Sequence, residues 1–96
     1  MQSYYHRVRK PRMITARKLG RHTKAEWLAL CAEFDQRCVR CGLKDYHIDK
    51  DHIVPLYLGG SDGLDNIQPL CARCNASKTG ESTNWAAYRR QHGFDD

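Results

Sequence analysis

The chain lacks a long apolar stretch, and none of its segments approaches the ~18 consecutive apolar residues of a membrane-spanning helix. Its N-terminus is basic, but no apolar segment of the kind found in secretory signals follows it. No internal repeat or low-complexity segment is present. With 96 residues, the chain has room for one domain at most. These absences predict a cytoplasmic protein that has no membrane partner.

Acidic residues are missing from the first 24 positions, which hold half of the 16 lysines and arginines. The basic residues of this segment are Arg7, Arg9, Lys10, Arg12, Arg17, Lys18, Arg21 and Lys24. The net charge of +5 comes entirely from this segment, because acidic residues outnumber basic ones in the rest of the chain. A basic segment of this kind suits a polyanion such as nucleic acid, through neutralisation of phosphates. A solvated tail that only aids solubility is the alternative.

Residues 1–22 also lack a sustained apolar period and contain Pro11 and Gly20, two residues that interrupt regular structure. We therefore predict a basic flexible arm over residues 1–22 and a folded domain over residues 23–96. A domain of that size usually needs a disulfide or a metal to stabilise it.

Cysteine occurs five times, an odd number that argues against a framework of disulfides. Four of the five form two CxxC pairs, Cys38 with Cys41 and Cys71 with Cys74, which predicts a tetrahedral zinc site. Four thiolates leave no open position on the metal, so the zinc is structural. A redox motif needs only one such pair, and it follows a strand instead of the helix expected here. The fifth cysteine, Cys31, lies on an apolar helix stripe and is interpreted as a packing residue.

The spacing of the two pairs is also informative. Residues 42–70 separate them, a gap of 29 residues, whereas a simple zinc ribbon has about 15–20. The segment between the pairs therefore holds more than a plain hairpin. We predict an extended segment over residues 46–57 that ends its pairing at Pro55, a loop over residues 59–63 and a short second strand over residues 67–70.

Helices are predicted on both sides of this segment. Thr23 and Glu26 match a capping box, and the apolar spacing after them predicts a helix from about 24 to 36. Gly42 suits the positive φ of a tight knuckle turn. The second knuckle is expected to open a helix that carries Asn75 and Lys78 and ends near Gly80. A last helix is expected to be capped by Ser82 or Thr83 and to face Trp85, Ala86 and Tyr88 inward.

Together, these elements resemble the HNH endonuclease family, in particular its small zinc-stapled, phage-type members. The resemblance covers roughly residues 24–80. The matching elements are Cys38-x2-Cys41, Asp51-His52-Ile53-Val54-Pro55-Leu56, Gly59-Gly60, Asp65-Asn66-Ile67-Gln68-Pro69-Leu70, Cys71-x2-Cys74-Asn75 and Lys78. The resemblance implies a small α+β zinc-stabilised domain: a ββα-metal, treble-clef-like core with flanking N- and C-terminal helices.

The resemblance also implies roles for four residues. His52 is the general base, since an unperturbed imidazole titrates near pH ~6.5 and can take a proton from water. Asp51 and Asn75 hold one catalytic divalent ion, with Mg²⁺ or Mn²⁺ favoured by their hard oxygen atoms. Asn66 holds the loop around His52 through side-chain hydrogen bonds. The family usually has histidine or asparagine at the position of Asn75, which makes this chain a His-Asn-Asn variant.

Several questions stay open in the sequence. Strict strand alternation puts Asp51 and His52 on opposite faces, unless a bulge or the end of the strand intervenes. His47 and Asp49 are either accessory polar residues or part of the solvent-exposed face, and we favour the exposed face. Lys78 either contacts a phosphate or is solvated. For Arg73, which lies inside the second knuckle, a DNA-backbone contact and a solvated surface are equally supported.

We therefore expect a metal-dependent DNA endonuclease of low sequence specificity that nicks DNA or cleaves both strands. A phage role in DNA processing or packaging, with terminase proteins as partners, accompanies the phage-type resemblance. The expected assembly is a monomer or weak dimer. The nucleic-acid-binding candidates are Lys78, Arg73, Arg7, Arg9, Lys10 and Arg12. The alternative is a zinc-finger DNA-binding module without catalysis, which explains the cysteines and the basic arm equally well.

Overall fold

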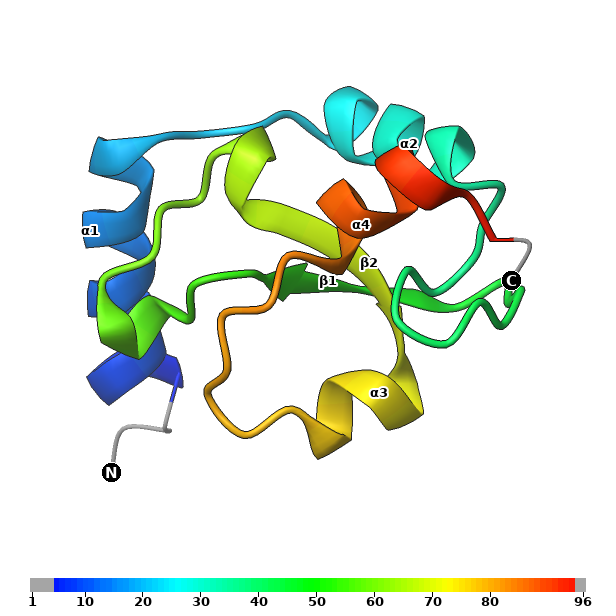
Figure 1. Ribbon diagram of the computed structural model, residues 1–96. Helices are drawn as coiled ribbons and strands as arrows, with labels where there is room; N and C mark the ends of the chain where they lie inside the picture. Colours follow the sequence, from blue (N-terminus) through cyan, green and yellow to red (C-terminus); the bar gives the residue numbers. More distant parts are fainter. Residues whose placement is uncertain (1–4, 95–96) are drawn as a thin grey trace.

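The computed structural model describes residues 5–94. Residues 1–4 and 95–96, the outer ends of the predicted arm and of the predicted domain, lie outside the described residues. The described part is a small α+β domain in which an antiparallel two-stranded sheet lies between helices (Figure 1). Strand β1 is Ile48–His52 and strand β2 is Ile67–Cys71. Their register pairs Ile48 with Cys71 and His52 with Ile67.

Helix α2, Lys24–Glu33, begins at the capping box predicted from the sequence. The Thr23 side chain accepts a hydrogen bond from the Glu26 amide, and the Glu26 side chain accepts one from the Thr23 amide. The helix ends at Glu33, three residues earlier than predicted, because Asp35 and Gln36 both adopt positive φ angles. Leu30 and Cys31 are buried on its inner face. Cys31 is thus the packing residue that the sequence predicted, and burial raises the pKa of its thiol.

The core is built around the cysteines. Leu30 from α2, Phe34 just after its end, Val39 from the first knuckle, and Ile67 and Leu70 from β2 pack with Ala86 and with three of the paired cysteines, Cys38, Cys71 and Cys74. Gly42 has a φ of 81°, as the knuckle turn requires. Helix α3, Ala72–Ser77, begins directly after Cys71 and contacts both strands. The predicted helix after the second knuckle is confirmed and carries Asn75, whereas Lys78 lies just past its end.

Helix α4, Trp85–His92, lies beside α2 over β2 (Figure 1). Its N-cap is Asn84, whose side chain accepts from the Ala87 amide, so the prediction of Ser82 or Thr83 was wrong. Ala86 is buried as predicted, but Tyr88 is 49% exposed and Arg89 faces inward instead. The Arg89 guanidinium donates to the carbonyl oxygens of Val39 and Arg40, which ties α4 to the first knuckle.

The N-terminal segment has regular structure where the sequence predicted a flexible arm. Tyr5–Arg9 forms a π-helix (η1), and Lys10–Leu19 forms helix α1. Pro11 interrupts neither, since it lies in the first turn of α1, where proline is tolerated. Of the α1 side chains only Ala16 is buried, so no apolar period marked this helix in the sequence. It packs against η2, a 3₁₀ turn at Leu56–Leu58.

Candidate active site and zinc centre

The four paired cysteines converge on one point. Their sulfur atoms all lie within 4.8 Å of one another, and the Sγ atoms of Cys41 and Cys71 are 3.8 Å apart. Zinc–sulfur bonds of about 2.3 Å in a tetrahedron place neighbouring sulfurs about 3.8 Å apart. The cluster therefore fits zinc, with two ligands from the knuckle after α2, one from the end of β2 and one from α3.

The protonation of these thiols follows from their surroundings. Burial opposes ionisation of Cys38, but the amide N–H groups of Cys41, Cys71 and Arg40 outweigh it and lower the pKa of this thiol to about 7. Burial raises the pKa of Cys41 and of Cys74. Metal binding requires thiolates, so binding of a metal such as zinc by these cysteines would release protons.

Asp51 and His52 lie on opposite faces of β1. The strand pairs residue for residue with β2 through both positions, so no bulge changes the alternation. Both residues nevertheless border one cleft of about 270 Å³, because β1 ends at His52. Asn75 and Lys78 line the same cleft, with Arg9 and Arg12 from the N-terminal segment. The structure thus brings the predicted base and both predicted metal ligands to one cavity.

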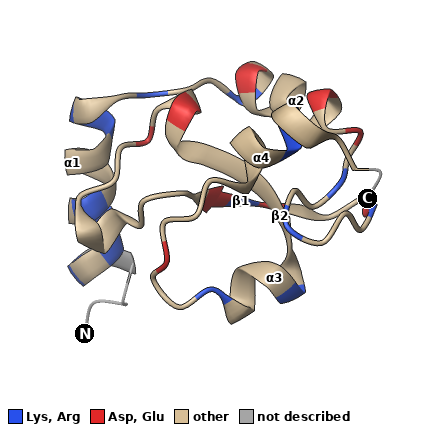
Figure 2. Cartoon of the chain, viewed as in Figure 1, with Lys and Arg blue, Asp and Glu red and all other residues tan. Residues whose placement is uncertain are grey.

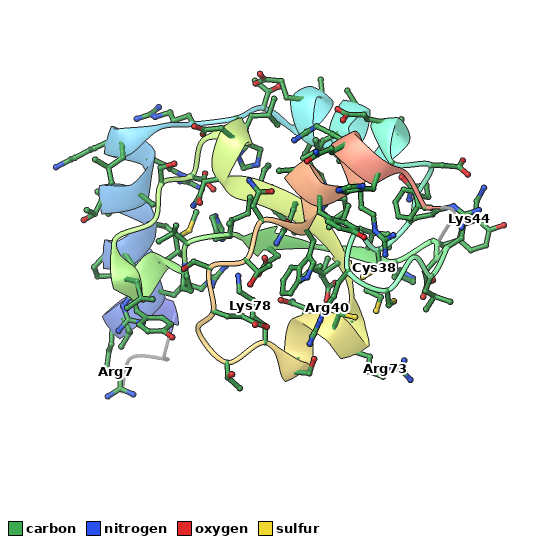
Figure 3. The ribbon with its side chains drawn as sticks, in the orientation of Figure 1. Arg7, Cys38, Arg40, Lys44, Arg73 and Lys78 are labelled. Atoms are coloured by element: carbon green, nitrogen blue, oxygen red, sulfur yellow. The ribbon has the colours of Figure 1, made fainter. Side chains whose placement is uncertain are left out.

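The Asp51 carboxylate is buried and already has partners. Lys78 Nζ lies 2.9 Å from each of its oxygens, and Gln68 Nε2 donates to Oδ2 at 3.0 Å. The Asp51 and Lys78 side chains are each only 6% exposed. Lys78 Nζ also lies 2.7 Å from the His52 carbonyl oxygen and 3.1 Å from that of Ile53. Lys78 is therefore a buried partner of Asp51 and not a solvated lysine, and Figure 3 shows it between α3 and β1.

The surroundings of Asp51 and Asn75 affect how a divalent ion would bind in this cleft. Asp51 and Asn75 offer hard oxygen donors on the wall of one cleft, and that donor set fits Mg²⁺ or Mn²⁺. The Asn75 amide donates to Asp49 Oδ2 at 3.3 Å, so Asp49 contacts α3 and is not simply part of the exposed face. Because the Lys78 ammonium occupies both oxygens of Asp51, a cation on this carboxylate competes with Lys78.

On the other face of β1, His52 meets a network that the sequence did not predict. Its Nε2 lies 2.8 Å from Oδ1 of Asp62, which is a loop residue. His22 Nδ1 lies 2.7 Å from the Asp62 carbonyl oxygen, and its Nε2 lies 2.6 Å from Lys50 Nζ. The sequence offered no spacing signal for His22 or Asp62, because this network joins segments that are 10 to 40 residues apart.

Asn66 holds the loop that follows His52. Its side chain accepts from the Val54 amide at 3.0 Å and donates to the carbonyl oxygens of Val54 and Ser61. Gly60 is required here, since a Cβ would lie 1.8 Å from the Val54 carbonyl oxygen. These contacts fix the chain direction two residues beyond His52.

The predicted nucleic-acid-binding residues are not gathered in one place. Arg9 and Arg12 border the cleft, and Arg7 and Lys10 do not. Figure 3 shows Arg73 projecting outward from α3, with Arg7 at the opposite side of the view. Figure 2 shows basic residues and no acidic ones on α1. The Arg40 guanidinium bonds Ser77 Oγ and stacks over Trp85, so it is engaged within the domain.

Comparison with known proteins decides the family. The sequence profile described as HNH endonuclease matches residues 38–81, which span both knuckles, both strands and α3. A "Probable HNH endonuclease" of Lactococcus phage SK1 is 40% identical over 80 residues, covering 70% of this chain and 83% of that protein. The chain belongs to the HNH endonuclease family. No solved structure gives a significant match.

The HNH match ends before α4 and begins after α1 and α2. His22 and four arginines of the N-terminal segment therefore lie outside the matched HNH region, although they line the same cavities as His52; the arginines are Arg9, Arg12, Arg17 and Arg21. Within residues 5–94, no helix of this HNH protein is both long and apolar enough to cross a membrane.

Proposed function

We propose that this protein is a metal-dependent DNA endonuclease with a ββα-metal, treble-clef-like core. The observation that carries the proposal is the single cleft lined by Asp51, His52, Asn75 and Lys78. Hydrolysis of a phosphodiester needs a proton acceptor for water and positive charge near the phosphate. The cleft offers both, since His52 and four basic residues, Arg9, Arg12, Lys50 and Lys78, border it.

His52 serves as the general base. Its Nε2 is engaged with Asp62, and its Nδ1 has no hydrogen-bond partner among the described residues. In the described part of the chain, every buried side-chain nitrogen has a hydrogen-bond partner. Since His52 Nδ1 has no such partner, it is not buried and is accessible to solvent. In this arrangement Nδ1 accepts the proton of the attacking water. Asn66 keeps the following loop in place.

Asp51 and Asn75 would hold the divalent ion, which supplies positive charge against the charge that develops on the phosphate. Arg9 and Arg12 border the same cleft and orient the DNA backbone by neutralising phosphates. By the family's chemistry the products carry a 5′-phosphate and a 3′-hydroxyl. Because contacts to phosphate carry no sequence information, we expect low sequence specificity.

The phage origin of the relative supports a role in phage DNA processing or packaging. In that role nuclease activity would depend on terminase-type partners, and the isolated protein would be weakly active. Co-purification with such a partner, together with stimulation of cleavage by it, tests this role. Because the proposed site provides one cutting centre per chain, cleavage of both strands needs a dimer, a partner or two successive events.

The test of the proposed function is plasmid nicking with a panel of Mg²⁺, Mn²⁺ and no added metal. We expect nicking by the parent, and a loss of about 10²–10⁴-fold in rate for His52→Ala, the usual contribution of a positioned base. His47→Ala is the matched control, since His47 is exposed and outside the cleft, and it should keep the parent rate. DNA binding that is independent of metal, without nicking, would instead support the non-catalytic zinc-finger module.

A further inference from the structure

In the hydrogen bond between His52 and Asp62, the donor and the acceptor can be assigned. A carboxylate only accepts hydrogen bonds, so the 2.8 Å contact requires a proton on His52 Nε2. The neutral ring then carries its free lone pair on Nδ1, the nitrogen without a partner among the described residues. The two side chains are 10% and 8% exposed, so water competes weakly for this bond.

The N-terminal segment holds Asp62 from outside the matched HNH region. The Asp62 amide donates to the Ala16 carbonyl oxygen of α1 at 3.1 Å. His22 Nδ1 must donate to the Asp62 carbonyl oxygen, which leaves its Nε2 to accept from Lys50. Arg17 Nε lies 3.7 Å from the other carboxylate oxygen of Asp62. Both backbone groups and the side chain of Asp62 are thus fixed by residues 16–22.

Close packing of backbone supports the same junction. A Cβ on Gly20 would lie 3.2 Å from the Cα of Gly63, the residue after Asp62. At that distance the neighbouring backbone would have to shift. The end of α1 therefore lies directly against the loop that carries Asp62, and Figure 1 shows α1 beside this loop.

We propose that Asp62 is a positioning residue that orients the His52 ring, so that Nδ1 faces the cleft, and that residues 16–22 hold Asp62 in place for this task. The inference rests on the proposed function of His52 as a base. It assigns a catalytic contribution to an N-terminal segment that the sequence predicted to be only a basic arm. It also explains why a basic helix packs against the loop instead of remaining in solution.

The test compares Asp62→Ala, Asp62→Asn and Asp65→Ala in the full-length, zinc-loaded chain. The backbone bonds of residue 62 do not need its side chain, so Asp62→Ala should keep the loop in place. Asn keeps the size and one acceptor oxygen but removes the charge. Asp65→Ala is the matched control, because Asp65 is exposed in the same loop and lines neither cavity that His52 borders.

Two readouts separate positioning from a merely structural role. The first is the proton NMR signal of His52 Nε2–H, assigned by its absence in His52→Ala. We expect a slowly exchanging signal in the parent and in Asp65→Ala, and its loss in Asp62→Ala. The second is nicking kinetics: kcat should fall at least about tenfold in Asp62→Ala with KM unchanged, and less in Asp62→Asn, against about 10²–10⁴-fold for loss of the base itself.

The outcomes are distinguishable. A parent that nicks, together with an Asp62→Ala variant that keeps the Nε2–H signal or the parent kcat, overturns this inference and leaves the proposed function intact. A lower kcat with an unchanged signal overturns it as well, since Asp62 then acts only on the fold. A parent that does not nick with any metal overturns the proposed function, and the positioning role fails with it.

Discussion

At the scale of single residues, the charge of Lys78 lies inside the domain. Its ammonium has only three N–H donors and lies within hydrogen-bonding distance of four oxygens, two of them on Asp51. Gln68 completes the surroundings of Asp51 and also donates to the Thr83 carbonyl oxygen. The Asp51 carboxylate is therefore paired with one ammonium and one amide in a place that water reaches poorly. Any cation that binds this carboxylate replaces a charge that the protein already supplies.

We predict that Lys78→Met lowers the free energy of unfolding by about 3–5 kcal/mol, because it leaves a buried carboxylate without its counter-charge. If Asp51 holds the divalent ion, Mn²⁺ should restore stability to the variant more than it stabilises the parent. Thermal unfolding of the zinc-loaded proteins with and without Mn²⁺ measures both effects.

Lys44→Met is the control for this substitution. Lys44 pairs with Asp35 at 3.2 Å, but the two side chains are 60% and 67% exposed. Such a surface pair contributes about 0–1 kcal/mol, so this variant should unfold near the parent temperature and gain nothing extra from Mn²⁺. Equal stabilisation of parent and Lys78→Met by Mn²⁺ would exclude Asp51 as a ligand.

At the scale of elements, helix α1 contributes to the site at both of its ends. Its end supports the loop that carries Asp62, and the turns around its start place Arg9 and Arg12 at the cleft. Arg12 is also stacked near the Tyr57 ring, at 5.9 Å, which fixes its direction toward η2. The basic charge of the N-terminal segment is therefore distributed unequally about the cleft.

This distribution gives a prediction about DNA binding. Arg9→Gln/Arg12→Gln should weaken binding and flatten the plot of log affinity against log salt by about 0.9 for each phosphate that the variant no longer neutralises. Arg7→Gln/Lys10→Gln removes the same charge from the same segment but away from the cleft, and we expect a smaller change. Titrations of duplex DNA at several salt concentrations measure the slopes. Equal slopes for the two variants would show that the segment acts only through its total charge.

The elements that the sequence predicted are those with local signals. The capping box at Thr23, the two knuckles and the strands on either side of the loop each depend on residues close together in the chain. Helix α1 escaped prediction because it buries only Ala16, and the inward turn of Arg89 escaped because its carbonyl partners lie 49 and 50 positions away. The resemblance to the family brought His52, Asp51 and Asn75 together, but the contact with Asp62 arises only from the tertiary fold.

At the scale of the whole molecule, the sulfur cluster joins the elements. The cysteines follow α2, end β2 and lie in α3, and the core residues Val39, Leu70 and Ala86 pack around them. In the described part of the chain, the buried hydrophobic residues outside this core are only Ala16, Cys31 and Ile53. The cleft is bordered by β1, by Asn75 of α3 and by Lys78 just after this helix, so its geometry depends on the same cluster.

We therefore predict that loss of zinc unfolds residues 24–92. Zinc binding to such sites supplies about 10–16 kcal/mol, comparable to the ~5–15 kcal/mol that stabilises a whole domain. Cys71→Ser/Cys74→Ser should lose the bound zinc, the helical circular dichroism of the parent and all nicking. Cys31→Ser is the control, since Cys31 is buried outside the cluster, and this variant should keep one zinc per chain and the parent spectrum. If the double variant kept the parent spectrum, the fold would not depend on zinc. Loss of nicking in that folded variant would then mean that the metal only shapes the cleft.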